Sequence, residues 1–215
     1  RVGAGEQLLN ASKVTGRTST GTGLGLLNAI SQDGNGELTD FSVAVVDQNL
    51  PNNGFVAVQS GQVIREGDRR DDWVGSAAFE VRDSLQRWSL YGQGGVNRRS
   101  DLNNGEGEGH GWSLEVSRIK GRLQWTAGHY TETPEYDPNA IGFLSAPNAA
   151  VDYASIEYRI PQPFEVLGLG FNRMSWEFQT EREMLHTPRA FVKQEYDLEW
   201  RLFLASFDFI QFGAT

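Results

Sequence analysis

The sequence predicts an all-β protein, and within that class an antiparallel up-and-down transmembrane β-barrel segment of about 11–12 strands. Three observations predict it. One long stretch alternates apolar and charged side chains, the connections between strands sort by length, and no stretch has the periodicity of an amphipathic helix.

The clearest strand covers residues 189–204. Its even positions are mostly apolar and its odd positions are mostly charged, and a period of two is typical of a strand because successive side chains leave opposite faces. At about 3.3 Å per residue the stretch extends about 50 Å, whereas ordinary strands have about five or six residues. One apolar and one charged face suit a wall between lipid and water, but also an outer strand of a soluble sandwich. The charged positions are Lys193, Glu195, Asp197, Glu199 and Arg201, opposite Val192, Tyr196, Leu198, Trp200, Leu202 and Leu204.

Composition excludes several classes of protein. A net charge of −9 argues against a nucleic-acid partner. The absence of cysteine removes disulfides, thiol catalysis and cysteine–zinc sites. No run of eighteen apolar residues forms a transmembrane helix. The chain begins at Arg1 without an initiator methionine, and we expect it to be cut from a longer protein.

The first half of the chain alternates weakly at first and then clearly. Strands are predicted at residues 7–15, 23–30, 41–46, 55–64, 73–81 and 88–96, separated by turns rich in Gly, Asn, Asp and Pro. Leu50–Gly54 is the strongest turn signal, because Pro presets φ and Asn-Gly accepts a positive φ. Residues 65–72 hold seven charged side chains around Gly67 and are expected to be solvated. Residues 97–109 are expected to form a long polar loop.

The second half continues the pattern. Strands are predicted at residues 112–116, 123–127, 150–160, 167–181 and 189–204, with a twelfth left open at residues 205–213. Residues 131–149 form the longest predicted loop and hold three prolines. From Trp73 onward, short and longer connections alternate. Because consecutive antiparallel strands reverse direction, the short connections fall at one end, as in outer-membrane barrels.

Alternation assigns side chains to two faces. The predicted lumen-facing residues are Arg173, Glu177, Lys193, Glu195, Asp197, Glu199 and Arg201. The predicted lipid-facing or girdle residues are Trp73, Trp88, Trp112, Trp125, Trp176, Tyr196 and Trp200. A membrane barrel requires the tryptophans on one outer face, whereas a sandwich requires them in a core between two sheets.

Three segments resemble one family. They are residues 8–18 (LLNASKVTGRT), residues 47–54 (DQNLPNNG) and residues 136–144 (YDPNAIGFL). They resemble the outer-membrane barrel family of Gram-negative bacteria in which a family-nine carbohydrate-binding-like domain precedes a barrel of unknown function. The resemblance implies that residues 1–215 are a single segment, the first half of a larger barrel, without the upstream domain and the downstream strands. It supplies no catalytic residues.

The loop motif within the third segment is Tyr136, Asp137, Pro138, Asn139 and Phe143. Pro138 pushes Asp137 toward an extended conformation, and Asn139 can close a turn through its side chain. The apolar residues that follow are ill suited to free solvation, so we expect an ordered loop. It folds inward to narrow the lumen or outward to dock another protein.

No catalytic, cofactor or metal site is predicted. The three histidines, His110, His129 and His186, lack metal-ligand spacing on one element. We therefore expect a non-enzymatic outer-membrane barrel for transport or surface assembly, in contact with the lipid bilayer. Other outer-membrane or surface proteins, and carbohydrate through the absent domain, are candidate partners. The alternatives are a soluble lectin-like β-sandwich and, with less support, a glycoside hydrolase acting through paired carboxylates.

Overall fold

The structure is a computed structural model that describes residues 6–67, 70–101, 105–139 and 147–214. These residues form one antiparallel sheet of thirteen strands and a single short 3-10 helix. The elements are β1 (Gln7–Arg17), β2 (Thr22–Gln32), β3 (Leu38–Asn49), η1 (Pro51–Asn53), β4 (Phe55–Arg65), β5 (Asp71–Arg82), β6 (Trp88–Asp101), β7 (Gly105–Arg118), β8 (Leu123–Glu132), β9 (Ala149–Ile160), β10 (Phe164–Val166), β11 (Leu169–Leu185), β12 (Ala190–Leu204) and β13 (Phe209–Ala214).

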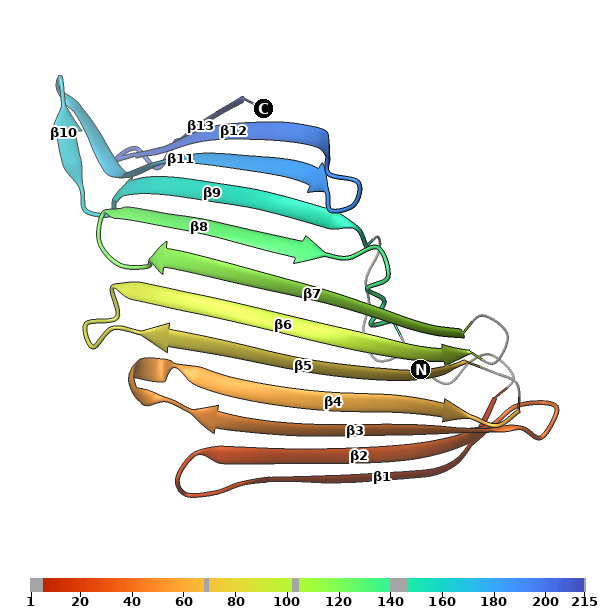
Figure 1. The fold of residues 1–215 in the computed structure, drawn as a ribbon. Coiled ribbons are helices and arrows are strands. Elements are labelled where there is room, and N and C mark those ends of the chain that lie inside the picture. Colours follow the sequence, from red (N-terminus) through yellow and green to blue (C-terminus); the bar gives the residue numbers. More distant parts are fainter. Residues whose placement is uncertain (1–5, 68–69, 102–104, 140–146, 215) are drawn as a thin grey trace.

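The strands follow one another across the sheet in chain order (Figure 1). The one exception is β10, which pairs only with the start of β11 and lies off the main path. The predicted all-β, antiparallel, up-and-down class is confirmed. The described strands number thirteen, and the sheet is not closed. The described residues form one sheet rather than the two packed sheets of a sandwich.

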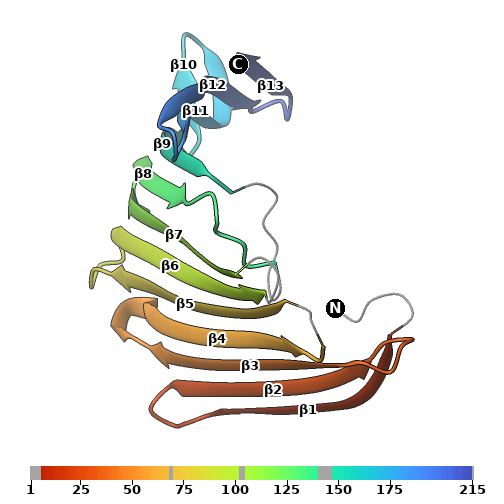
Figure 2. The same cartoon turned by 45° about the vertical axis from the view of Figure 1, so that its right-hand side comes forward.

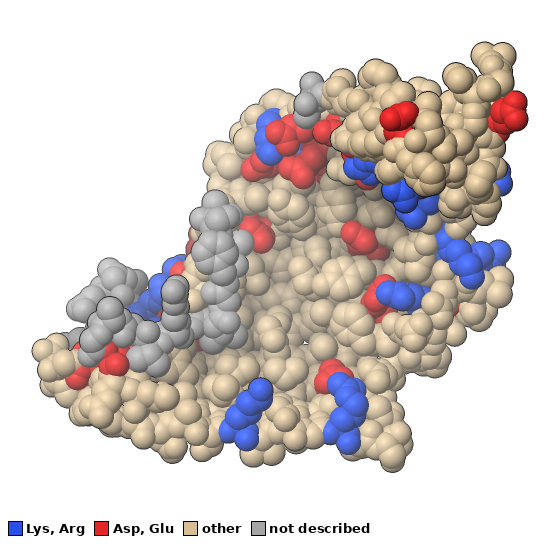
Figure 3. Space-filling model, turned by 180° about the vertical axis from the view of Figure 1, so that it is seen from behind, with Lys and Arg blue, Asp and Glu red and all other residues tan. Residues whose placement is uncertain are grey.

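The sheet is strongly curved, so it has a convex and a concave face. Figure 2 shows the strands curling from β1 at one edge to β13 at the other. Figure 3 views the hollowed concave face, on which acidic and basic side chains gather around a largely uncharged centre. Right-handed strand twist, summed over many neighbours, produces this trough.

The predicted sorting of the connections by length is wrong except at one place, because residues 33–37 and 186–189 at the second end are as short as the turns at the first end. The β1–β2, β5–β6 and β7–β8 turns share the first end, together with η1. In the predicted turn at η1, Asn52 and Asn53 have φ values of 59° and 63°, which Asn tolerates. The longest connection, residues 133–148, leaves β8 at the opposite end.

Two predicted loops are wrong. Residues 97–109 belong mainly to β6 and β7, and Asn97 is only 1% exposed because a later segment covers it. Residues 65–72 are not uniformly solvated, because Asp71 begins β5 and the Asp72 side chain is 2% exposed. Asp72 stays buried as an ion pair, with its carboxylate 2.8 Å from Arg65 Nη1 and 2.6 Å from Arg70 Nε.

Several predicted strands are longer in the structure, and one prediction also missed a separate strand. The strand at residues 167–181 is in fact the longer β11, preceded by the separate short strand β10. Leu167 and Gly168, both with positive φ, form the tight turn between them, and the Leu167 side chain is 97% exposed. Phe164 and Phe171 stack with ring centroids 5.0 Å apart across this hairpin.

The sheet has little apolar core of its own. Among the described residues, the almost fully buried apolar side chains are Val63, Val74 and Val151. Most large apolar side chains of the described residues remain exposed. In the edge strands β1 and β13 every residue is exposed. An exposed apolar face and unpaired strand edges drive association in water.

We therefore predict that a chain of residues 1–215 associates in detergent-free buffer. Its convex face and its two open edges offer surface for contact with other copies, and detergent should suppress the association by covering that surface. Size-exclusion chromatography with light scattering measures the outcome. A monodisperse monomer without detergent, melting cooperatively, would contradict the prediction.

Candidate functional site

The strand register places the predicted lumen-facing residues together on the concave face. Arg173 pairs with Phe203, and Glu177 pairs with Glu199, so both lie on the face of β11 that continues across β12. The alternation of β12 puts the other predicted residues on this same face. They are Lys193, Glu195, Asp197, Glu199 and Arg201.

These charged side chains are bonded to their neighbours. Lys193 Nζ lies 2.9 Å from Glu195, 3.5 Å from Glu181 and 3.6 Å from Glu183. Arg201 forms an ion pair with Glu199 on the same strand. The Arg173 guanidinium lies over the Phe203 ring, 3.9 Å from its centroid. The concave face of β11 and β12 is thus a partly compensated, predominantly acidic surface.

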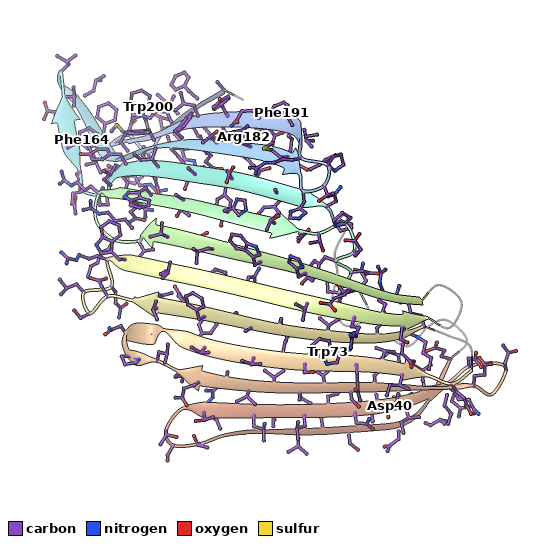
Figure 4. The ribbon with its side chains drawn as sticks, viewed as in Figure 1. Asp40, Trp73, Phe164, Arg182, Phe191 and Trp200 are labelled. Carbon is purple, nitrogen blue, oxygen red and sulfur yellow. The ribbon has the colours of Figure 1, made fainter. Side chains whose placement is uncertain are left out.

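The predicted girdle residues lie on the opposite, convex face. Trp176 pairs with both Trp200 and Tyr158, and Tyr196 pairs with Thr180 on the same face. Continuing the register through β9, β8, β7, β6 and β5 places the remaining tryptophans there as well, namely Trp73, Trp88, Trp112 and Trp125. Figure 4 shows Trp73 and Trp200 among the side chains of this face.

Tryptophan contacts on the convex face are local. Trp88 and Trp125 pack edge to face with their centroids 5.5 Å apart, and Trp73 Nε1 donates a hydrogen bond to Ser60 Oγ at 3.0 Å. Trp112 and Trp200 are each 46% exposed. An indole that keeps one polar contact while exposing its ring suits a boundary between an apolar and a wet phase.

The segment after β8 folds onto the concave face. Thr133 N donates to His110 O at 2.9 Å, and His110 N donates back to Thr133 Oγ1 at 3.0 Å. Further along, Asp137 N donates to Asn97 Oδ1 at 2.9 Å. Residues 133–137 therefore dock on the inner side of β6 and β7, and this docking buries Asn97.

Glycines in the wall make room for this segment. A Cβ at Gly109 would lie 2.3 Å from the backbone of Glu135 and Tyr136. A Cβ at Gly111 would lie 3.0 Å from the Tyr136 ring, and one at Gly95 would lie 2.7 Å from its hydroxyl. The Tyr136 side chain therefore packs against glycines of two strands, β6 and β7.

Asp137 fastens the end of the segment by charge. Its Oδ2 lies 3.4 Å from both Arg70 Nη2 and Arg99 Nη1, and its Oδ1 accepts the Asn139 N–H at 3.2 Å. Burial raises the pKa of Asp137, but the bond from Asn139 and the two guanidinium groups outweigh it, and the pKa lies below its usual value. The turn predicted at Asn139 is closed through the Asp137 carboxylate, which accepts hydrogen bonds from both the backbone and the side chain of Asn139. Phe143 lies outside the described residues.

A recess of about 550 Å³ opens on the concave face beside this segment. Four of the six tyrosines of the chain line it, with two glutamates and several small polar side chains. They come from β6, β7, β8, β9 and the docked segment, and we call them the tyrosine recess: Tyr91, Glu115, Tyr130, Glu132, Tyr136 and Tyr153.

Sequence reasoning did not single out most of the tyrosine recess. Only Tyr136 was among the predicted site residues. In the sequence, Tyr91 alternates with Trp88 and Leu90 and shares a face with the polar Ser89 and Gln93, but strand periodicity does not show which residues of different strands meet. The pairing of Tyr91 with Glu115, and of Gly128 with Tyr153, brings them into one row. The sequence feature that could have indicated the recess is an aromatic residue, Tyr91, on an otherwise polar strand face.

The histidines are not brought together. His129 Nδ1 lies 2.8 Å from Asp152 Oδ1 on the convex face, and His186 Nδ1 lies 2.9 Å from Thr131 Oγ1. In the parts of the chain that the structure describes, no group of three or more His, Asp or Glu side chains could hold a metal ion. No helix among the described residues is long and apolar enough to cross a membrane.

Comparison with known proteins identifies a family for the chain. The sequence model of one family, described as a domain of unknown function (DUF5916), matches residues 3–215. No curated protein and no solved structure matches the chain significantly.

We predict that Gly109→Ala detaches the docked segment. The new Cβ would meet backbone atoms, which cannot rotate away, and overpacking of this kind costs about 1–3 kcal/mol. Amide hydrogen exchange of residues 133–137 should accelerate. Gly25→Ala is the matched control on the same face, since its nearest atoms would lie 3.9 Å away. Equal protection in both variants would contradict the close packing.

We also predict that acid loosens the docked segment. The folded-state pKa of Asp137 is below the ordinary value of 3.8, so its contribution to stability is present above that value. The contribution disappears as the pH falls below about 4 and through the depressed pKa. Protection factors of residues 133–137 should fall between pH 5 and about pH 3.

The matched variants for this acid effect are Asp137→Asn and Asp83→Asn. Asp137→Asn should lower protection above about pH 4, where the carboxylate is charged, and remove the acid dependence. Asp83 caps the β5–β6 turn at the opposite end, where it accepts the N–H groups of Arg87 and Trp88. Its replacement should leave residues 133–137 unchanged. Unaltered acid dependence in Asp137→Asn would refute the assignment.

Proposed function

We propose that this chain, which belongs to the DUF5916 family, is the wall of a β-barrel in the outer membrane of a Gram-negative bacterium, surrounding a polar passage for solutes. One observation carries the proposal. From β5 to β12, aromatic and aliphatic side chains dominate the convex face, while most ion pairs lie on the concave face, the pair of His129 and Asp152 being an exception. Lipid outside and water inside require this arrangement in a membrane barrel.

The dimensions of the convex face support the proposal. On β6 the outward side chains are apolar or glycine from Trp88 to Val96, and Arg98 follows. On β12 they are apolar or aromatic from Tyr196 to Leu204, and Gln194 precedes them. Eight residue steps span about 26 Å along a strand, comparable with an apolar band about 25 Å tall before tilt is counted.

Backbone pairing supports it as well. Each strand from β2 to β9, and β11, is hydrogen-bonded on both sides through most of its length, whereas β12 is paired on its outer side only over residues 198–203. A strand in hydrocarbon must satisfy its N–H and C=O groups in this way, since no water is present to do so. In outer-membrane barrels the short turns face the periplasm, so we assign the end with residues 133–148 to the cell exterior.

The docked segment supports transport rather than a closed structural wall. It narrows the space beside the tyrosine recess without occupying the recess itself. A loop folded against the inner wall can restrict which solutes pass. The docked segment therefore favours transport over surface assembly. Surface assembly is supported only by the apolar edges of the sheet.

We further propose, from the resemblance described above, that the chain forms part of a larger barrel that follows a carbohydrate-binding-like domain. The unpaired outer edges of β1 and β13 support continuation of the sheet, because an open edge in hydrocarbon is unfavourable. Carbohydrate is then a partner of that other domain rather than of residues 1–215.

Substitutions on the two faces of β12 test the proposal in the full-length protein. Leu198→Arg and Trp200→Asp place charge on the convex face, where an Arg near the bilayer midplane costs about 2–4 kcal/mol. Glu199→Gln is the control between them on the concave face. We expect both convex variants to reduce the detergent-extracted, heat-modifiable protein in outer-membrane fractions while the control assembles normally. Equal yields from all three, or recovery without detergent, would refute the membrane assignment.

A further inference from the structure

The tyrosine recess has the chemistry of a ligand site that the passage alone does not require. The side chains that line it include two carboxylates and no Lys or Arg among the described residues. Lys193 lies outside the recess and interacts electrostatically with Tyr130. Its charge is compensated by ion pairs with three glutamates of β11 and β12. The recess is therefore negatively charged.

Two tyrosine rings are packed closely against glycines of the wall. The Tyr153 ring crosses Gly128, where a Cβ would lie 2.3 Å from its Cζ, and its hydroxyl reaches Glu115 Oε2 at 2.9 Å. Tyr136 lies in the same manner over Gly111. Both rings also line the recess. The faces of aromatic rings carry negative potential, which attracts cations.

Several polar groups of the recess are left for a ligand. The Tyr91 hydroxyl is bonded to Gln93 Oε1 at 2.7 Å, and the Glu115 carboxylate accepts Ser117 Oγ at 3.0 Å in addition to Tyr153. In contrast, no described residue hydrogen-bonds to the half-buried Glu132 carboxylate or to the Tyr130 hydroxyl. An unpartnered carboxylate beside aromatic faces is suited to a positively charged group.

We propose that the tyrosine recess binds an organic cation, with a quaternary or protonated ammonium group held between the faces of its tyrosines and the carboxylate of Glu132. A saccharide also stacks on aromatic rings, but it does not require negative charge without a compensating base. The volume of the recess is within the range of small-molecule sites, about 300–1,000 Å³. The inference rests on the proposed function, because a hydrated lumen is what brings solutes to this face.

The test is titration calorimetry of the purified full-length protein with three probes. Choline carries the quaternary ammonium, 3,3-dimethylbutan-1-ol has the same shape without charge, and maltose represents a neutral saccharide. We expect choline to bind about tenfold or more tightly than the alcohol, because cation–π attraction and the carboxylate act only on the cation. Equal binding of choline and the alcohol, preferential binding of maltose, or no binding would overturn the proposal.

Variants locate the binding. Glu132→Gln and Tyr130→Leu should each weaken choline about tenfold, while Tyr130→Phe, which keeps the ring, should stay within about threefold of the unmodified protein. Asp197→Asn is the matched control, a concave-face carboxylate of β12 outside the recess. Loss of choline binding in Asp197→Asn, or none in Glu132→Gln, would refute the site. Calorimetry measures choline binding whether or not the protein requires detergent. An absence of choline binding is therefore distinguishable from a failure of the protein to assemble in the membrane.

Discussion

The two-residue period of the strands, held in register from β1 to β13, is the constraint on which the structure depends. Register keeps Trp176 beside Trp200 and Glu177 beside Glu199. A slip of one residue on β12 would turn its carboxylates to the convex face and its aromatic rings to the concave face. The irregular pairings at Phe171/Arg173 and Glu183/Met184 lie near the ends of β11, so its long middle section alternates without interruption.

Glycine in the wall has a second role, which is to admit the docked segment. Gly95, Gly109 and Gly111 form a smooth inner surface on β6 and β7, and any side chain at Gly109 would meet backbone. The segment in turn covers Asn97 and adds Tyr136 to the recess. Docking is therefore encoded by two parts of the chain that must match, small residues in the wall and anchoring groups in the loop.

Alternation made the fold class and the two faces predictable from the sequence, because both are local properties of a strand. The misassigned stretches are those where a distant segment changes the environment. Residues 97–109 are polar and glycine-rich because they receive the docked segment, and Asp72 is buried because Arg65 and Arg70 reach it. The recess escaped prediction for the same reason, since Tyr91 and Tyr153 belong to different strands whose pairing no short pattern reports.

Tyr136 belongs both to the docked segment and to the recess, and this shared membership has a thermodynamic consequence for the proposed site. A cation held against the Tyr136 ring contacts the protein only while residues 133–137 are docked. Ligand and docking must then stabilise each other by the same free energy, since linkage is reciprocal. The groups that hold the segment, Asp137 with Arg70 and Arg99, are not among the residues that line the recess. Loosening that anchor would therefore weaken binding without altering any side chain of the recess itself.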